Sequence, residues 1–272
     1  MTEMLKLFDA HFHIIDYRFP LVANQSYLPP EFTVEDYLQR AKPLNIYGGA
    51  VVSGSFQAFD QTYLLTALSV LGPNFVGVTQ LPSTVSDEEI IQLNQQGIRA
   101  VRFNLKRGGS ESIHQLKYFA HRIYEMVRWH VEIYVDSKEL GDLTNLLLEL
   151  PAVSIDHLGL SQSGFSKLLH LVEHGIKIKA SGFGRVDFDV KKALQTIAQI
   201  NPDALLFGTD LPSTRAPRPF LDSDIQLIRD LFDEELTEKF CTETRVIFIA
   251  KANLLHKLII LFYGKAQTSQ RA

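Results

Sequence analysis

Two histidines, His11 and His13, close the first apolar segment of the chain and have the spacing of a shared ligand set. Side chains two apart on an extended strand point to the same side, so both imidazoles can reach one oxygen atom or one metal ion. The same kind of ending recurs later, where His157 follows Val-Ser-Ile-Asp and Asp210 follows Leu-Leu-Phe-Gly-Thr. Three imidazoles and a carboxylate can polarise a carbonyl group and activate a water molecule. The pattern therefore indicates one site suited to hydrolysis, provided that these segments meet.

The elements that must position these residues are predicted by the alternation of short apolar segments with longer helical patterns, which favours strand–helix units and a parallel sheet. The predicted strands are Leu7–Ala10, Ile46–Val52, Phe75–Thr79, Ile98–Phe103, Val131–Val135, Val153–Ile155, Ile176–Lys179 and Ala204–Phe207. The turn after the first strand is His-Phe-His, not the glycine-rich turn of a doubly wound sheet. We therefore predict a (β/α)8 TIM barrel that forms a single domain over residues 1–272. In such barrels the chemistry takes place at the carboxyl ends of the strands, where the four residues stand.

Helix ends support this division of the chain. Thr33-Val-Glu-Asp36 and Ser86-Asp-Glu-Glu89 have a hydroxyl followed three residues later by a carboxylate, which is typical of a helix start. Gly72 and Gly97 follow helical patterns, where a left-handed residue commonly ends a helix. Residues after Leu221 are expected to form the last barrel helix and the C-terminal packing.

Composition excludes several classes of protein. A hydrophobic content of 46% with 21% charged residues describes an ordinary globular chain, and a net charge of −4 gives no basis for a nucleic-acid or anionic-membrane partner. A lone cysteine, Cys241, excludes an internal disulfide and fits a reducing compartment. Glu3 and Lys6 interrupt the N-terminus before a signal-like stretch forms, and apolar runs such as 258–263 are too short to span a bilayer. We expect a cytoplasmic protein and predict no particular oligomeric state.

Taken together, these motifs resemble the amidohydrolase superfamily (amidohydrolase 2 type), and within it the branch that contains 2-pyrone-4,6-dicarboxylate lactonase. The motifs are Asp9-Ala-His11-Phe-His13, Val52-Ser-Gly-Ser-Phe56, Gly97-Ile-Arg-Ala-Val-Arg-Phe-Asn104, Ile155-Asp-His157-Leu-Gly, Ile178-Lys-Ala-Ser-Gly182 and Phe207-Gly-Thr-Asp210-Leu-Pro. The resemblance implies that Asp210 is the general base for the attacking water. It also implies that His11, His13 and His157 orient or polarise the water and the scissile carbonyl.

The same resemblance implies that arginines hold the carboxylates of a small-molecule substrate, and the candidates are Arg102, Arg107 and Arg185. The guanidinium group binds a carboxylate with two parallel hydrogen bonds and keeps its charge, so the chemistry agrees. Arg102 can serve only if its strand presents it to the barrel interior. Tyr134 and Ser55 are expected to add hydrogen bonds at the mouth of the site.

Whether a metal takes part is decided by the ligand pattern. Many amidohydrolases bind one or two divalent ions, but here the fourth strand ends in Arg-Phe-Asn without a lysine for a bridging carbamate, and the fifth ends without a histidine. A single zinc ion held by His11, His13, His157 and Asp210 is chemically sensible. The lactonase branch is thought to need no metal, and we favour that arrangement.

Three functions are consistent with the sequence. The leading hypothesis is a hydrolase that opens a lactone or related ester carrying carboxylates. The second is a metal-dependent decarboxylase of aromatic or unsaturated acids, and the third is a binding barrel without catalysis. The chain has Leu211-Pro-Ser213 where lactonase relatives tend to have Trp and His around the proline, which puts the substrate in doubt. The segment Ile14–Pro30 is predicted to be either a lid or an ordered surface loop.

Overall fold

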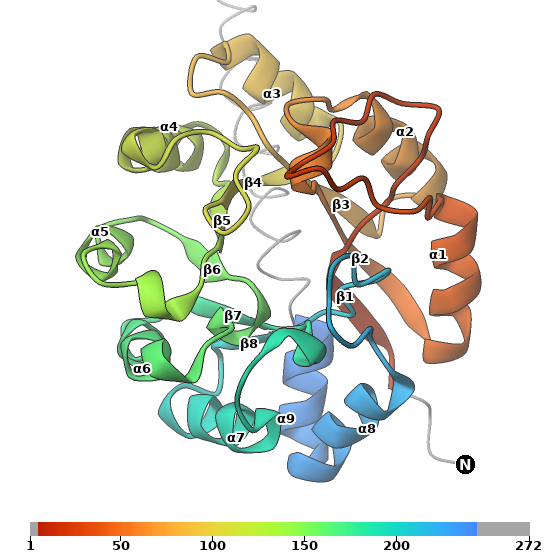
Figure 1. Ribbon diagram of the computed structural model, residues 1–272. Helices are drawn as coiled ribbons and strands as arrows, with labels where there is room; N and C mark the ends of the chain where they lie inside the picture. The colour runs from red at the N-terminus through yellow and green to blue at the C-terminus, as the bar shows by residue number, and fades with distance from the viewer. Residues whose placement is uncertain (1–4, 244–272) are drawn as a thin grey trace, which may run out of the picture.

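Eight parallel strands follow one another in chain order around a barrel, and the connecting helices lie outside them (Figure 1). The computed structural model describes residues 5–243. The strands are β1 (Leu7–Phe12), β2 (Ile46–Val52), β3 (Phe75–Thr79), β4 (Ile98–Asn104), β5 (His130–Tyr134), β6 (Val153–Ile155), β7 (Lys177–Ala180) and β8 (Leu205–Phe207). The helices are α1 (Val34–Ala41), α2 (Thr62–Leu71), α3 (Asp87–Gln95), α4 (Leu116–Val127), α5 (Leu143–Leu148), α6 (Phe165–Glu173), α7 (Val190–Ile200), α8 (Asp222–Leu231) and α9 (Glu234–Glu238). The predicted barrel is confirmed, and each predicted strand matches an observed one to within two residues at either end.

The helix ends also agree with the sequence. Thr33 accepts a hydrogen bond from the Asp36 amide and the Asp36 carboxylate accepts one in return, which forms a capping box before α1. Gly72 and Gly97 have positive φ angles of 86° and 103° after α2 and α3. The expected C-terminal packing beyond residue 243, including the apolar run 258–263, lies outside the described residues. Among the residues described, no helix is both long and apolar enough to cross a membrane.

The first and last strands are joined just beyond their carboxyl ends. The Asp210 amide donates to the His11 carbonyl oxygen at 2.7 Å, and the His13 amide donates to the Leu211 carbonyl oxygen at 2.7 Å. Gly208 permits this approach, because a Cβ atom there would lie 2.9 Å from the backbone nitrogen and from the Cβ atom of His11. The backbone that closes the barrel is thus the backbone that carries three of the predicted site residues.

A buried carboxylate, that of Asp9, strengthens this junction. It accepts hydrogen bonds from the Thr209 amide (2.8 Å), the Thr209 hydroxyl (2.6 Å), the His11 amide (3.1 Å) and the Tyr37 hydroxyl (3.2 Å). Burial raises the pKa of Asp9 to about 6, although each of these hydrogen bonds acts to lower it. Asp9 therefore fixes the residues that precede Asp210 against those that carry His11.

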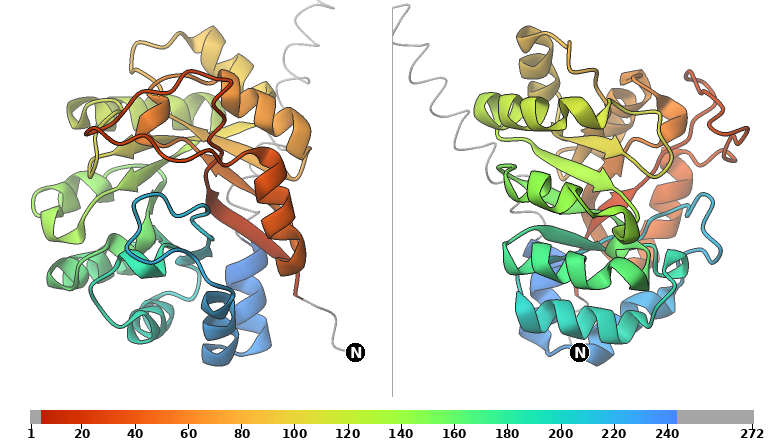
Figure 2. Two further views of the ribbon diagram at one scale, coloured as in Figure 1. Left: turned by 45° about the vertical axis from the view of Figure 1, so that its right-hand side comes forward. Right: turned by 60° about the vertical axis from the view of Figure 1, so that its left-hand side comes forward.

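The long connection from β1 to α1 crosses the carboxyl ends of several strands (Figure 2). The Val22 amide donates to the Phe56 carbonyl oxygen after β2, at 2.8 Å. The Asn24 amide group donates to the Arg107 carbonyl oxygen after β4, at 3.2 Å. The segment Ile14–Pro30 thus bonds to the loops after β2 and β4 and covers part of the end of the barrel where the site was expected.

Asp9 gives a prediction about stability and pH. Its carboxyl binds its proton more tightly in the folded protein than in the unfolded chain, so its contribution to stability is present at pH 4 and is lost as the pH rises past 6. A shift of roughly two pKa units corresponds to about 3 kcal/mol at most. The Asp9→Asn variant should lack this loss when the free energy of unfolding is measured by denaturant titration from pH 4 to 7.

Tyr37→Phe is the matched variant for this test. It removes a hydrogen bond that lowers the pKa of Asp9, so it should increase the loss of stability between pH 4 and 7. Equal pH dependence in the wild type and in Asp9→Asn would show that Asp9 ionises normally in the folded protein.

Candidate active site

The four residues predicted to form a site converge at the carboxyl end of the barrel. The ring of His11 lies 5.0 Å from that of His13 and 4.7 Å from that of His157, measured between centroids. Asp210 Oδ1 lies 3.8 Å from Nε2 of His13 and 3.8 Å from Nε2 of His157. All four side chains are buried. The structure therefore places one carboxylate oxygen between two imidazoles, with a third imidazole alongside.

Unusual backbone conformations aim two of these side chains. His157 and Asp210 have φ angles of 51° and 61°, in the left-handed region that residues other than glycine rarely adopt. Such conformations cost free energy and gather at functional sites, where surrounding contacts hold them. Gly182 (φ 60°) leaves the space that His157 needs, because a Cβ atom there would lie 2.7 Å from His157 Nδ1. The turns after β6 and β8 are thus shaped to turn these groups into the barrel.

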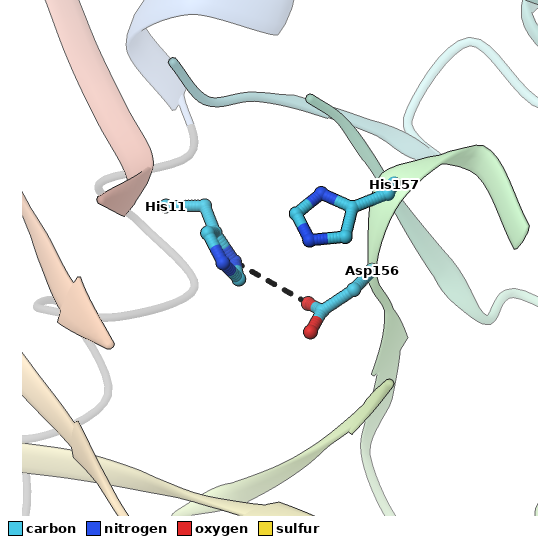
Figure 3. A group of neighbouring side chains, drawn as sticks. All are labelled: His11, Asp156 and His157. Carbon is cyan, nitrogen blue, oxygen red and sulfur yellow. Dashed lines mark ion pairs between the residues drawn. The ribbon is translucent and has the colours of Figure 1, made fainter. Parts of the chain in front are cut away.

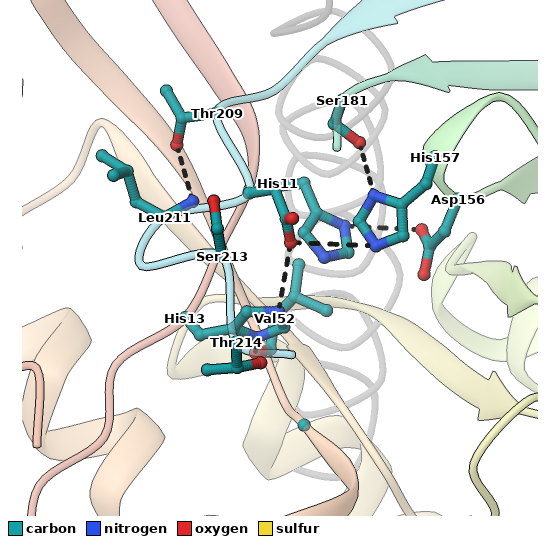
Figure 4. Close-up of polar contacts among 12 residues, drawn as sticks. His11, His13, Val52, Asp156, His157, Ser181, Thr209, Leu211, Ser213 and Thr214 are labelled. Carbon is teal, nitrogen blue, oxygen red and sulfur yellow. Dashed lines mark hydrogen bonds and ion pairs between the residues drawn. The ribbon is translucent and has the colours of Figure 1, made fainter. Parts of the chain in front are cut away.

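Hydrogen bonds hold Nδ1 of two imidazoles and set the proton position on one of them (Figure 4). His13 Nδ1 lies 2.6 Å from the Val52 carbonyl oxygen, which can only accept, so the His13 proton is on Nδ1 and Nε2 presents a lone pair. His157 Nδ1 lies 3.0 Å from the Ser181 hydroxyl. Burial lowers the pKa of His13 and of His157 well below the ordinary value, and the nearby His11 acts in the same direction. Both rings are neutral near pH 7.

Asp156 is a component of the site that the sequence prediction missed. Its Oδ2 accepts two hydrogen bonds from Arg102, from Nε at 3.1 Å and from Nη2 at 2.8 Å, and its Oδ1 lies 3.4 Å from His11 Nδ1 (Figure 3). Burial alone would raise the pKa of Asp156, but the charges of Arg102 and its neighbours hold it well below its usual range. The available signal was its position, directly before His157 at the end of a strand.

A second missed pair lies inside the barrel. Lys179 of β7 is fully buried, and its Nζ lies 2.5 Å from Glu132 Oε1 of β5. The same ammonium group lies 2.9 Å from the Ala10 carbonyl oxygen and 3.2 Å from His11 Nδ1. Charged residues in the middle of otherwise apolar strands were the signal that could have indicated this pair.

A pocket lined by His13 and His157 opens to the surface. Its lining includes every residue predicted to bind substrate, namely Arg102, Arg107, Arg185, Tyr134 and Ser55, together with Tyr27 and Arg215. Arg102 does point into the barrel, as its role requires, but its Nε and Nη2 already donate hydrogen bonds to Asp156. Arg185 donates to Asp210 Oδ2 at 2.6 Å. Two of the predicted arginines are therefore paired with acids of the site itself.

The arginines at the pocket mouth differ from these. Arg215, which the sequence prediction missed, lies over the ring of Tyr27 at 4.3 Å and donates to the Asn24 side chain at 3.2 Å. Within residues 5–243, neither Arg107 nor Arg215 is paired with a carboxylate. Tyr27 and Arg215 supply an aromatic surface and a polar group near the proline turn, where Trp and His were expected from the resemblance. Both belong to loops, so no strand pattern could indicate them.

Comparison with known proteins agrees with this geometry. Residues 8–244 match the family model described as amidohydrolase. The chain belongs to the amidohydrolase family. A 4-sulfomuconolactone hydrolase of Rhizobium radiobacter is 26% identical over 225 residues, which is 75% of each chain. A 2-pyrone-4,6-dicarboxylate hydrolase of Comamonas testosteroni is 26% identical over 232 residues, which is 75% of this chain and 76% of that one.

The amidohydrolase fold is also matched by solved structures. A Pseudomonas putida protein assigned as a 2-pyrone-4,6-dicarboxylic acid hydrolase superposes with a TM-score of 0.77 at 26% identity, over 90% of this chain and 97% of that one. The predicted resemblance to the lactonase branch is thereby confirmed at the level of the family and its relatives.

Amidohydrolases often bind divalent ions, and the donor atoms here fit one such ion. Ligand atoms of His11, His13 and Asp210 lie within 4.8 Å of one another, and those of His11, Asp156 and His157 do so as well. His13 has the arrangement of a zinc ligand, with Nδ1 bonded to a backbone carbonyl and a lone pair on Nε2. His11, His13 and Asp210 would hold the ion in the first of these arrangements, and the ion would lower the pKa of a bound water and polarise a carbonyl.

The buried histidines of this amidohydrolase predict a loss of stability in acid. Burial lowers the pKa of His157, so the unfolded chain binds a proton below pH 6.5 that the folded protein does not. The stability is therefore present above pH 6.5 and is lost as the pH falls. His157→Gln should reduce the fall in unfolding free energy between pH 7 and 5, measured by denaturant titration. The exposed His114→Gln is the control, and equal effects of the two changes would contradict the assignment.

Proposed function

We propose that this protein hydrolyses a lactone or related ester of a small carboxylate-bearing substrate, with water activated by Asp210. The observation that carries the proposal is the position of Asp210 Oδ1. This oxygen is buried, has no hydrogen-bond partner among the described residues, and lies 3.8 Å from two neutral imidazoles. A water molecule beside it would find a base for one proton and a lone pair on His13 Nε2 for the other.

The residues support a balanced sequence of steps. Arg185 occupies Oδ2 of Asp210, which leaves Oδ1 directed at the water. Asp210 takes a proton as the water oxygen forms a bond to the carbonyl carbon, and hydrogen-bond donors of the site stabilise the negative carbonyl oxygen. The ring C–O bond then breaks, and the leaving oxygen takes the proton from Asp210, which restores the carboxylate. Because lactones are activated acyl groups, we propose that this reaction requires no metal.

The charge of the pocket supports an anionic substrate. Arg102 and Arg185 are neutralised by Asp156 and Asp210, whereas Arg107 and Arg215 have no carboxylate partner in the described part of the chain. Planar guanidinium groups bind carboxylates and related anions with two parallel hydrogen bonds. The two curated relatives are named for lactones with sulfonate or carboxylate groups, which agrees with this arrangement.

The alternative hypotheses are less well supported. A decarboxylase of this superfamily would be expected to have a further histidine from a later strand, but the end of β7 presents Lys179 and Ser181 to the site. A barrel that only binds its ligand would be favoured if Asp210 or His157 pointed away from the mouth. Both point into the site instead.

The decisive experiment is hydrolysis of 2-pyrone-4,6-dicarboxylate by the purified protein, with and without a chelator. We expect turnover that resists the chelator and that falls by about 10³-fold or more in Asp210→Asn, because the general base is lost. Asp142→Asn, an exposed aspartate on the outer surface, is the control and should keep full activity.

Other outcomes of this experiment are equally informative. Turnover retained in Asp210→Asn would exclude Asp210 as the base, and activity abolished by chelator and restored by zinc would show a metal-dependent reaction. Absence of turnover in the wild type would exclude this substrate. A panel of lactones bearing one or two anionic groups would then be tested in the same way.

The pocket mouth gives a separate prediction on specificity. Arg107→Gln and Arg215→Gln should each raise KM for a lactone with two anionic groups by about tenfold, since each removes one charged hydrogen-bond donor. The kcat should change little, and KM for a lactone with one anionic group should change less. Arg229→Gln on the exposed face of α8 is the control. A loss of kcat at unchanged KM would place these arginines in the chemical step instead.

A further inference from the structure

The ammonium group of Lys179 lies beside Nδ1 of His11, at 3.2 Å. Its other contacts among the described residues include Glu132 Oε1 at 2.5 Å, the Ala10 carbonyl oxygen at 2.9 Å and Asp156 Oδ1 at 3.9 Å. The ammonium group has only N–H donors. A donor directed at Nδ1 requires a lone pair on that nitrogen. In a neutral imidazole the proton must then be on Nε2.

Asp156 favours the opposite proton position on the same ring. Its Oδ1 lies 3.4 Å from His11 Nδ1 and could accept a hydrogen bond from this nitrogen if it carried the proton, as carboxylates do for metal-ligating histidines. This contact is longer than the 3.2 Å contact of Nδ1 with Lys179, and the same carboxylate oxygen also lies 3.9 Å from the Lys179 ammonium group. Asp156 instead uses Oδ2 to bind Arg102. The geometry thus favours the proton position that Lys179 selects.

We propose that Lys179 is a positioning residue that keeps the His11 proton on Nε2, so that His11 donates a hydrogen bond to the carbonyl oxygen of the substrate. His11 Nε2 supports this role, because it is buried and has no hydrogen-bond partner in the described structure. A buried donor without a partner costs free energy, and a substrate oxygen would remove that cost. The hydrogen bond from His11 to the substrate carbonyl rests on the proposed hydrolase function. The position of the His11 proton does not depend on that function.

The proposal gives the two histidines of the first motif opposite tasks. His13 Nδ1 faces a carbonyl oxygen, so its Nε2 is an acceptor. His11 Nδ1 faces an ammonium group, so its Nε2 is a donor. His13 and Asp210 would accept hydrogen bonds from the attacking water. His11 would donate a hydrogen bond to the carbonyl oxygen on which negative charge develops. This arrangement distinguishes the water from the carbonyl by polarity as well as by shape.

The same contact bears on metal binding. His11 could ligate an ion through Nε2 only with its proton on Nδ1, and that N–H would then face the N–H groups of Lys179 at 3.2 Å. Lys179 therefore disfavours His11 as a ligand and leaves His13, His157 and Asp210 for any ion. An amidohydrolase site of this kind would bind zinc more weakly than its count of histidines suggests.

Nitrogen NMR of histidine-labelled protein without substrate tests the proton position directly. Long-range ¹H–¹⁵N spectra distinguish the protonated from the unprotonated ring nitrogen, and His11→Gln assigns the His11 signals. We expect Nε2 of His11 to carry the proton and Nδ1 of His13 to carry it. A proton on His11 Nδ1 in the wild type would overturn the proposal whether or not the protein hydrolyses lactones.

Two variants test whether Lys179 is the cause. Lys179→Met combined with Glu132→Gln removes the buried pair without leaving an unpaired charge, which would otherwise be strongly destabilising. We expect the His11 proton to move to Nδ1, toward Asp156. Glu132→Gln alone is the matched control, because its side-chain oxygen still accepts from Lys179 and Asp156 Oδ1, at 3.9 Å, remains as an opposite charge. The proton should stay on Nε2 in this variant. An unchanged proton position in the double variant would show that Lys179 does not set it.

Zinc affinity and kinetics give readouts that a purely structural role would not produce. The double variant should bind zinc at least about tenfold more tightly than the wild type in a competition titration, because His11 becomes available as a ligand. Its kcat on a lactone substrate should fall by about 10²-fold with little change in KM, as expected when one oxyanion donor is lost. If the double variant does not fold, the wild-type spectrum still tests the proposal, because a proton on His11 Nδ1 overturns it.

Discussion

The burial of charge inside the barrel is the constraint on which the site depends. Lys179, Glu132, Asp156 and Arg102 come from β7, β5, the end of β6 and β4, and all four are buried. An isolated charge in such surroundings costs several kcal/mol, so each of these groups needs an opposite charge within reach. The Lys179–Glu132 and Arg102–Asp156 pairs meet this need, each between strands that are two apart in the barrel. A shift of one strand by one residue would turn one member of a pair away and leave its partner unpaired.

The site therefore has two parts: the strand ends, which buried charge pairs hold in place, and the mouth, which loops form. The chemical groups stand on strand ends or on turns directly after them, and the charge pairs and the Asp9 hydrogen bonds hold them from below. The mouth is made by loops, where Tyr27, Arg107 and Arg215 come from three separate connections. Loops can change sequence without disturbing the barrel. The mouth can therefore change its charged and aromatic groups while the strand ends stay the same.

Much of the fold and part of the site could be predicted from the sequence, for a physical reason. Buried parallel strands are short apolar runs, and functional side chains of a barrel follow them directly, so His157 and Asp210 could be identified from local patterns. Contacts across the barrel interior cannot be identified in this way. The pairing of Arg102 with Asp156 depends on which side of β4 faces inward and on what the end of β6 presents opposite it. Arg215 lies in a loop whose path no periodicity describes.

The acidic partners of Arg102 and Arg185 weaken the prediction that these two side chains bind the substrate. Each guanidinium already donates to a buried carboxylate, so a substrate carboxylate would have to replace or share that partner. The net gain from such an exchange is smaller than from a guanidinium that faces water. Arg185 is moreover bonded to Asp210, and displacing it would disturb the base that the reaction requires. We therefore propose that Arg107 and Arg215 recognise the anionic group at the mouth, while Arg102 and Arg185 hold the acids of the site in place.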